Sequence, residues 1–266
     1  LNYHIDLCID VVFLFLRIKQ AKMRIVLIVL SLAFFNGSKI LAQQTEVDPI
    51  MEAYQSALQQ YKSSSYAMAY QAFKSLDELI EDNNSLVAIN TDYYKALSAM
   101  RLYNDDAVFL LKSFRVDYPN STLFYEATRN LADLYYSKRA YQEASYYYEL
   151  IEISKIRKKD RANYKFQFAY SLFSQDELKS AAAIFHDLLS NESEYKNKSK
   201  YYFGYIAYAE GNFATAKRHF EDLLEMGLFV TEIPLYITQI YHQQKEYKLL
   251  LDFSLAYVDS INDESV

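Results

Sequence analysis

The side chains that can do chemistry are few in this sequence, and their spacing does not assemble a reactive site. No pair among its 4 histidines has the spacing of metal ligands. The single cysteine, Cys8, lies in an N-terminal stretch that we expect to be removed, which leaves neither a disulfide nor a thiolate nucleophile. No Gly-x-Ser-x-Gly nucleophile turn occurs, and 4 scattered glycines predict no phosphate-binding loop. The sequence therefore predicts no enzyme activity, no metal site and no cofactor.

Charged residues are numerous, and we interpret them as surface. The carboxylates of residues 77–82 are typical of a solvated helix face. A basic cluster at residues 155–161 follows an apolar pattern, and we interpret it as cations at a helix C-terminus, where the macrodipole favours them. Contact with phosphate or a membrane is the alternative for this cluster. The chain has a formal net charge of −6, and loss of residues 1–42, with five cations and two carboxylates, would leave −9. Such an acidic body predicts that nucleic acid is not a partner.

The composition indicates which elements carry these side chains. The 266 residues include only 4 Gly and 3 Pro, where average usage would give roughly 19 and 13. We therefore expect few tight turns and few strand ends, and helices joined by short polar connections. Hydrophobic residues make up 52% of the chain, which is enough for a core and excludes global disorder. The 27 Tyr and 17 Phe must then lie on repeated packing faces of an all-α protein.

The N-terminal region has the pattern of a secretory signal. Basic residues at 17–24 precede an apolar stretch at residues 25–35, and a short polar segment then leads to a small residue, Ala42. These are the three regions of a signal peptide, which we expect to be cut after Ala42. The prediction is a protein secreted across the inner membrane, most simply into the periplasm.

Two points about this region stay open at the level of sequence. Met23 begins the signal segment, so we interpret residues 1–22 as an upstream extension and residues 23–42 as the signal peptide. A retained membrane anchor is the alternative, because residues 7–16 are also apolar, although neither apolar stretch reaches the roughly 20 residues of a spanning helix. A membrane is a partner only in that case.

A four-point pattern recurs through residues 50–260. An aromatic or apolar residue is followed by Ala three positions later, a large apolar residue four positions after that, and another after three more, as in Phe213, Ala216, Phe220 and Leu223. These spacings place all four residues on one face of a helix. The pattern begins at Tyr66, Asn104, Tyr141, Leu178, Phe213 and, in degraded form, Tyr247. Most units also carry a small residue twelve positions before the Ala, which predicts a pair of closely packed helices in each unit.

This register resembles the tetratricopeptide repeat family, whose repeat is a 34-residue helix-turn-helix. The fifth unit matches it best, with Gly204, Gly211 and the Phe213 pattern, and Pro119 occupies the place of the family's closing proline. The resemblance implies an all-α, right-handed α-solenoid of about six repeats within residues 43–266. The expected units lie near residues 50–82, 88–120, 125–159, 162–195, 197–229 and 231–260. An ordinary helical bundle is the alternative, and a further hairpin or domain beyond Val266 is a hypothesis.

In the family, the first helix of each pair lines the inner, concave surface. On that resemblance we expect an aromatic groove at Tyr136, Phe166, Tyr170, Phe173, Tyr201, Tyr205, Tyr208 and His242. Tyrosine combines a large apolar face with a hydroxyl and is enriched at interaction hot spots. The alternative is that these rings pack between neighbouring helices.

These features together predict a non-catalytic protein–protein interaction scaffold of the bacterial cell envelope, which binds a peptide or helix of its partner along the groove. A module that stacks a glycan or cell-wall polymer on the same rings is the second hypothesis. The family's clamp for a C-terminal carboxylate is not supported, because Tyr54, Leu58, Asp92 and Ala96 stand at its places. The oligomeric state stays open.

Overall fold

The computed structural model of the chain describes residues 48–190 and 192–263, with side chains up to Tyr257. The expected extension and signal peptide lie outside the described residues. Contacts divide the chain into two units, residues 1–55 and 56–266, and each is considered by itself. The described part of the first unit is the beginning of helix α2 (Pro49–Lys62). Within the described ranges no helix is long and apolar enough to cross a membrane.

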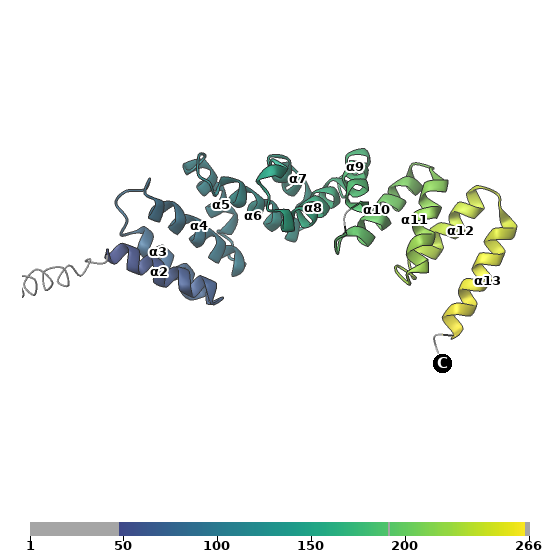
Figure 1. Ribbon diagram of the computed structural model, residues 1–266, viewed down its shortest axis with the longest axis horizontal. Coiled ribbons are helices and arrows are strands. Elements are labelled where there is room, and N and C mark those ends of the chain that lie inside the picture. The colour runs from purple at the N-terminus through teal and green to yellow at the C-terminus, as the bar shows by residue number, and fades with distance from the viewer. Residues whose placement is uncertain (1–47, 191, 264–266) are drawn as a thin grey trace, which may run out of the picture. The chain divides into compact units, whose positions relative to one another are not determined.

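Every regular element of residues 48–190 and 192–263 is a helix, and from α3 onward each α-helix packs against the α-helix that follows it in the chain (Figure 1). After α2 come α3 (Tyr66–Asp77), α4 (Leu86–Arg101), α5 (Ala107–Asp117), α6 (Phe124–Ser137), α7 (Tyr141–Glu149), α8 (Arg161–Phe173), α9 (Leu178–Leu189), α10 (Lys196–Ala209), α11 (Phe213–Glu225), α12 (Ile233–Gln243) and α13 (Tyr247–Asp263). Short connections join α2 to α3, α4 to α5, α6 to α7, α8 to α9, α10 to α11 and α12 to α13, and we number these six helix pairs as successive hairpins. The expected all-α solenoid is confirmed.

The small residues of the repeat lie where paired helices approach most closely. The pattern alanines of the second helices, among them Ala144 and Ala216, are fully buried, and so is Ala169 of α8. Gly204 of α10 shows how little space is left, because an added Cβ would lie 3.0 Å from Cε1 of Phe220. The large residues that follow each alanine, such as Phe185 and Phe220, are also fully buried. The pattern therefore predicts correctly which side chains form the core.

The turns inside the hairpins differ from the expectation that few glycines mean few tight turns. One residue in each turn has a left-handed backbone, at a φ between 57° and 77°. Only one of these residues is a glycine. They are Ser64, Tyr103, Arg139, Asp176, Gly211 and Lys245. The expectation was wrong because a single left-handed residue is tolerated at a cost of about 1–2 kcal/mol, so a tight turn does not require glycine.

The connection between α7 and α8 is the longest in the described chain. It runs from residue 150 to residue 160 and contains two 3₁₀ turns, η1 (Ile153–Lys155) and η2 (Lys158–Asp160). In the basic cluster, Lys155 lies in η1, Arg157 lies between the two turns, Lys158 and Lys159 lie in η2, and Arg161 is the first residue of α8. The interpretation of these cations as helix C-terminal residues is therefore wrong, because α7 ends at Glu149 and most of them precede the N-terminus of α8.

Candidate interaction surface

The residues predicted to line a groove lie on four first helices of successive hairpins. Tyr136 belongs to α6, Phe166, Tyr170 and Phe173 belong to α8, Tyr201, Tyr205 and Tyr208 belong to α10, and His242 belongs to α12. Their spacing within α8 and α10 is three or four residues, which places them on one side of each helix. The packing order of the hairpins then brings rings from different helices together.

Five of these residues, together with Tyr236 of α12, form a continuous series of ring contacts, which we call the ring path. Tyr136 lies 5.9 Å from Tyr170, and Phe173 of the same helix lies 5.5 Å from Tyr205, between ring centroids. Tyr236 of α12 continues the series, at 5.6 Å from Tyr205 and 5.4 Å from Tyr208. The ring path is thus Tyr136, Tyr170, Phe173, Tyr205, Tyr236 and Tyr208, and all six side chains are half-buried. Each ring therefore packs on its neighbours and keeps part of its surface in solvent.

Two of the predicted groove residues pack against residues outside the ring path. Phe166 is only 7% exposed and lies 5.8 Å from Phe185, within the core between α8, α9 and α10. Tyr201 stacks on Phe229 with the ring centroids 4.5 Å apart, and burial raises its pKa. Phe166 therefore offers little surface to a partner, whereas Tyr201 is half-buried like the residues of the ring path.

Sequence reasoning missed two tyrosines of this region. Tyr236 belongs to the ring path, while its neighbour Leu235 is exposed on another side of α12. Tyr202 of α10 lies 5.2 Å from both Tyr170 and Phe173. Tyr202 lies fourteen residues before Ala216, and Tyr236 lies fourteen residues before Leu250, the matching position of the sixth unit. A tyrosine at the same repeat position in both units was the sequence signal that could have identified them.

A pocket of about 390 Å³ lies beside one end of the ring path. Its lining combines hydroxyl, amide and imidazole groups with one leucine: Tyr208, Thr238, Gln239, His242, Gln243 and Leu250. The hydroxyl of Tyr208 donates to Oε1 of Gln239 at 2.7 Å, while His242 is exposed. Tyr208 and His242, predicted separately, are thus brought together. Such groups can hydrogen-bond a peptide backbone or a polar side chain.

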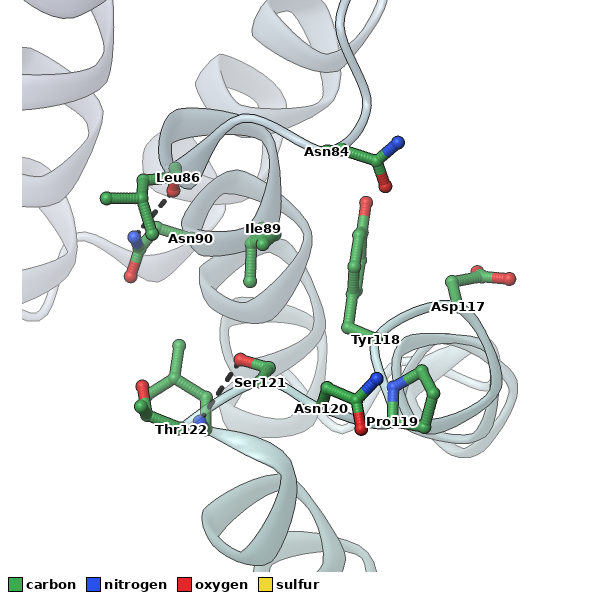
Figure 2. Close-up of a pocket in the computed structure, with 11 residues that line it drawn as sticks. Asn84, Leu86, Ile89, Asn90, Asp117, Tyr118, Pro119, Asn120, Ser121 and Thr122 are labelled. Carbon is green, nitrogen blue, oxygen red and sulfur yellow. Dashed lines mark hydrogen bonds between the residues drawn. The ribbon is translucent and has the colours of Figure 1, made fainter.

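A second pocket, of about 420 Å³, lies between the start of α4 and the connection from α5 to α6 (Figure 2). Asn84 and Asn90 bring amides to it from one segment, and Asn120 brings an amide from the other. The hydroxyl of Tyr118, which stands beside Asn84 in Figure 2, donates to Oδ2 of Asp92 at 2.7 Å. Sequence reasoning did not find this pocket, since no periodic spacing links its two segments.

The ionisable groups of the interior are held neutral or paired. Burial raises the pKa of Tyr136 to about 12, so its hydroxyl is a hydrogen-bonding group at neutral pH and not a phenolate. Burial also raises the pKa of Asp133, although its carboxylate accepts a hydrogen bond from Tyr148 at 2.6 Å. Among residues 48–190 and 192–263, no group of three His, Cys, Asp or Glu residues could hold a metal ion.

Comparison with known proteins bears on the fold. No family model matches the sequence, and no curated protein matches it. The C-terminal part of a TPR repeat-containing protein from Cytophaga hutchinsonii superposes with a TM-score of 0.59 at 15% identity, over 83% of this chain and 86% of that one. MamA from AMB-1 gives 0.53 at 15% identity, over 65% and 88%. Tetratricopeptide-like repeats of a putative kinesin light chain from Podospora anserina give 0.50 at 13% identity, over 65% and 92%.

The fold is therefore that of the tetratricopeptide repeat proteins, which are α-solenoids built from helical hairpins. The register of buried alanines and the superpositions agree on this class. At identities of 15% or less the likeness defines the fold alone, so the role of the chain has to be argued from its own surface.

Proposed function

We propose that this protein is a non-catalytic scaffold that holds a peptide or helix of a protein partner along the ring path and in the pocket beside His242. The observation that carries the proposal is the continuity of six half-buried rings across α6, α8, α10 and α12. Rings that serve only to form a hydrophobic core need only to be buried. This series instead keeps a polar hydroxyl on five of its six members, and each of the six residues stays partly exposed to solvent.

The geometry of the rings favours a protein partner over a glycan. The planes of Tyr136 and Tyr170 meet at 73°, those of Phe173 and Tyr205 at 78°, and those of Tyr205 and Tyr236 at 82°. In such edge-to-face pairs the edge of one ring lies on the face of the next. A sugar stacks on an open ring face, whereas peptide side chains fit between ring edges and hydroxyls. We therefore do not propose a glycan as the ligand, and attachment to polysaccharide is one outcome of the crosslinking experiment described below.

The scaffold is proposed to work in the periplasm of a bacterial envelope. The support is the signal pattern of residues 23–42 and the acidic character of the remaining chain. N-terminal sequencing of the protein recovered from a periplasmic fraction should begin at Gln43. Recovery of residues 23–42 in the membrane fraction would replace this proposal with the anchored form.

The partner is sought by photo-crosslinking in the native envelope. A benzophenone amino acid replaces Tyr170 on the ring path, and a matched probe replaces Tyr146, which is 57% exposed on α7 and lies outside the path. One enriched protein attached at position 170 and absent at position 146 supports the scaffold. Attachment to polysaccharide, or to nothing beyond the protein itself, contradicts it.

Replacement of Tyr170 and Tyr205 by Phe separates binding from packing. The variant keeps both rings and removes both hydroxyls, so its unfolding curve should match that of the parent protein while binding weakens about tenfold, which is about 1.4 kcal/mol. The measurement is titration calorimetry with the crosslinked partner. An unchanged affinity would show that the hydroxyls do not contact it.

A further inference from the structure

The α7–α8 connection has a positive net charge, although the chain as a whole is acidic. Residues 150–160 hold four cations and two carboxylates, in a chain of formal net charge −6. Arg129 of α6 and Arg161 of α8 lie beside the connection and are also cationic. We call the four exposed cations of this segment the basic connection: Lys155, Arg157, Lys158 and Lys159.

Helix electrostatics do not favour these cations. Lys158 and Lys159 immediately precede Asp160, the N-cap of α8, and Arg161 is the first residue of that helix. The N-terminus of a helix carries about half a positive charge, so cations there lower stability instead of raising it. The α8 helix has no acidic residue in its first turn to offset them. The helix dipole therefore does not account for the placement of Lys158 and Lys159, whereas Arg157 pairs with Asp160 and Lys155 lies over the ring of Tyr125.

The basic connection is held in a fixed position. Ile151 and Ile156 are each 5% exposed and anchor it in the core with Tyr164. The hydroxyl of Tyr164 donates to the backbone carbonyls of Tyr148 at 2.8 Å and Ile151 at 3.3 Å. The cations are thus presented from a segment ordered in advance, which lowers the entropy cost of binding an opposite charge.

Part of this surface already binds a carboxylate of the protein itself. Oδ2 of Asp160 lies 2.7 Å from Nε of Arg157 and 3.4 Å from Nη1 of Arg129. Nε of Arg129 is buried and makes no hydrogen bond within the described chain. A shallow hollow joins these groups, lined by Tyr125, Glu126, Arg129, Lys155, Ile156 and Arg157. The arginines are therefore placed to bind carboxylates, while Lys158 and Lys159 have no ion pair in the described structure.

The carboxylates that face this region are too few to neutralise it. Glu126 accepts a hydrogen bond from Tyr93 at 3.3 Å, and Asp160 is shared between two arginines. Ile153 and Leu150 add apolar surface, at 39% and 43% exposure. A ligand that matches this mixture carries several carboxylates and some apolar side chains.

We propose that the basic connection is a second docking surface, which binds an acidic segment of a protein partner. It lies on the α7–α8 connection, whereas the ring path lies on the first helices, so the two surfaces can act on separate parts of one partner or on two partners. Carboxylates of the segment pair with Lys155, Lys158 and Lys159, and its apolar side chains contact Ile153.

The test uses fluorescein-labelled decaglutamate and measures its fluorescence anisotropy with the full-length mature chain. The variant replaces Lys155, Lys158 and Lys159 by Glu. The matched control replaces three exposed lysines elsewhere, Lys179, Lys198 and Lys248, by Glu, and so makes the same change in net charge. We expect the first variant to bind about tenfold more weakly than the control, because three attractive contacts with the peptide become repulsive. We also expect the difference to shrink at high salt.

Three results would overturn the proposal. The parent protein could fail to bind decaglutamate, both variants could lose binding equally, or the loss could appear only with vesicles of phosphatidylserine and not with the peptide. The last result would assign the surface to anionic lipid. Replacement of the same three lysines by Gln should give an intermediate loss, which guards against an effect of the introduced carboxylates. Crosslinking at position 170 is independent of every one of these outcomes, so the ring-path proposal stands or falls separately.

Discussion

The fifth hairpin, α10 and α11, and the sixth, α12 and α13, differ in how completely they follow the repeat. The fifth has Gly204, Ala216, Phe220 and Leu223 at its pattern positions, and all four are buried. The matching places of the sixth hold Thr238, Leu250, Ser254 and Tyr257, none of which is fully buried.

The two helices of the sixth hairpin differ in how well their side chains are buried. Ile233, Ile237 and Ile240 of α12 are fully buried in one core with Phe220, whereas Leu251 and Leu255 of α13 are each 57% exposed. Helix α12 also supplies Tyr236 to the ring path and His242 to the pocket. The proposed binding surface therefore extends past the hairpin with the complete packing pattern, onto a helix of the hairpin that lacks it.

The largest difference between the two hairpins should appear when the large pattern residue is removed. Replacement of Phe220 by Ala should lower the free energy of unfolding by about 3–5 kcal/mol, because the ring is fully buried and stacks on Tyr236. Replacement of Ser254 by Ala, at the matching place in the sixth hairpin, should change it by less than about 0.5 kcal/mol. Urea unfolding followed by circular dichroism measures both. Equal losses would mean that the sixth hairpin packs as tightly as the fifth.

A smaller effect is expected from filling the closest approach of the fifth hairpin. Replacement of Ala216 by Leu should overpack α10 against α11 and cost about 1–3 kcal/mol. Ala214 lies two residues away on the exposed side of α11, and its replacement by Leu is the matched control, with an expected change within about 0.5 kcal/mol. Thermal melts of the two variants give the comparison. If Ala216 tolerates Leu as well as Ala214 does, the repeat register is wrong.

The coupling between the two hairpins can be measured through the ring path. A double-mutant cycle on Tyr205 and Tyr236, each replaced by Ala, should give an interaction energy of about 0.5–1.5 kcal/mol for rings 5.6 Å apart. Unfolding free energies of the four proteins supply the cycle. An interaction energy near zero would show that the contact does not tie α12 to α10.

The smallest expected effect is a dependence of the fifth hairpin on pH. His219 is buried, and burial, followed by the charges of Arg218 and Lys200, lowers its pKa below the ordinary 6.5. The unfolded chain then binds a proton at higher pH than the folded chain. The contribution of this group to stability is therefore complete above about pH 6.5 and is lost as the pH falls toward the folded-state pKa.

Unfolding curves at a series of pH values test this sign. The parent protein should lose stability between pH 7 and pH 5, and replacement of His219 by Gln should reduce the slope. The control replaces Ser254 of the sixth hairpin by Ala, which removes no ionisable group and should keep the parent's slope. A steeper slope in the His219 variant would contradict the assignment.

The fold was predictable because its signal repeats. Six occurrences of one pattern fix the helix pairs, and Ala144, Ala181 and Ala216 are buried as the spacing requires. The ring path was predictable in part, since three-residue and four-residue spacings place Tyr170 and Phe173, or Tyr205 and Tyr208, on one side of a helix. Tyr236 was missed, like Tyr202 at the same place in the fifth unit, because the predicted inner face was set one residue earlier in each first helix.

Features that depend on contacts between distant segments were not accessible from spacing. The pocket at Asn84, Asn90 and Asn120 requires residues 84–90 and residues 117–123 to meet, and nothing periodic relates the two segments. The basic connection was misinterpreted for a related reason, because α7 ends earlier than the charge pattern suggests and two 3₁₀ turns carry the cations toward α8.

The left-handed turn residues lower the free energy that is needed to open individual hairpins. Five of the six hairpin turns place a side chain where the backbone prefers glycine, at Ser64, Tyr103, Arg139, Asp176 and Lys245. That strain is released whenever a hairpin separates, so it lowers the free energy of each local opening and leaves the alanine core intact. Amide hydrogens near these turns should exchange faster than those near Gly211. Every hairpin except the fifth should therefore open locally at a lower free-energy cost.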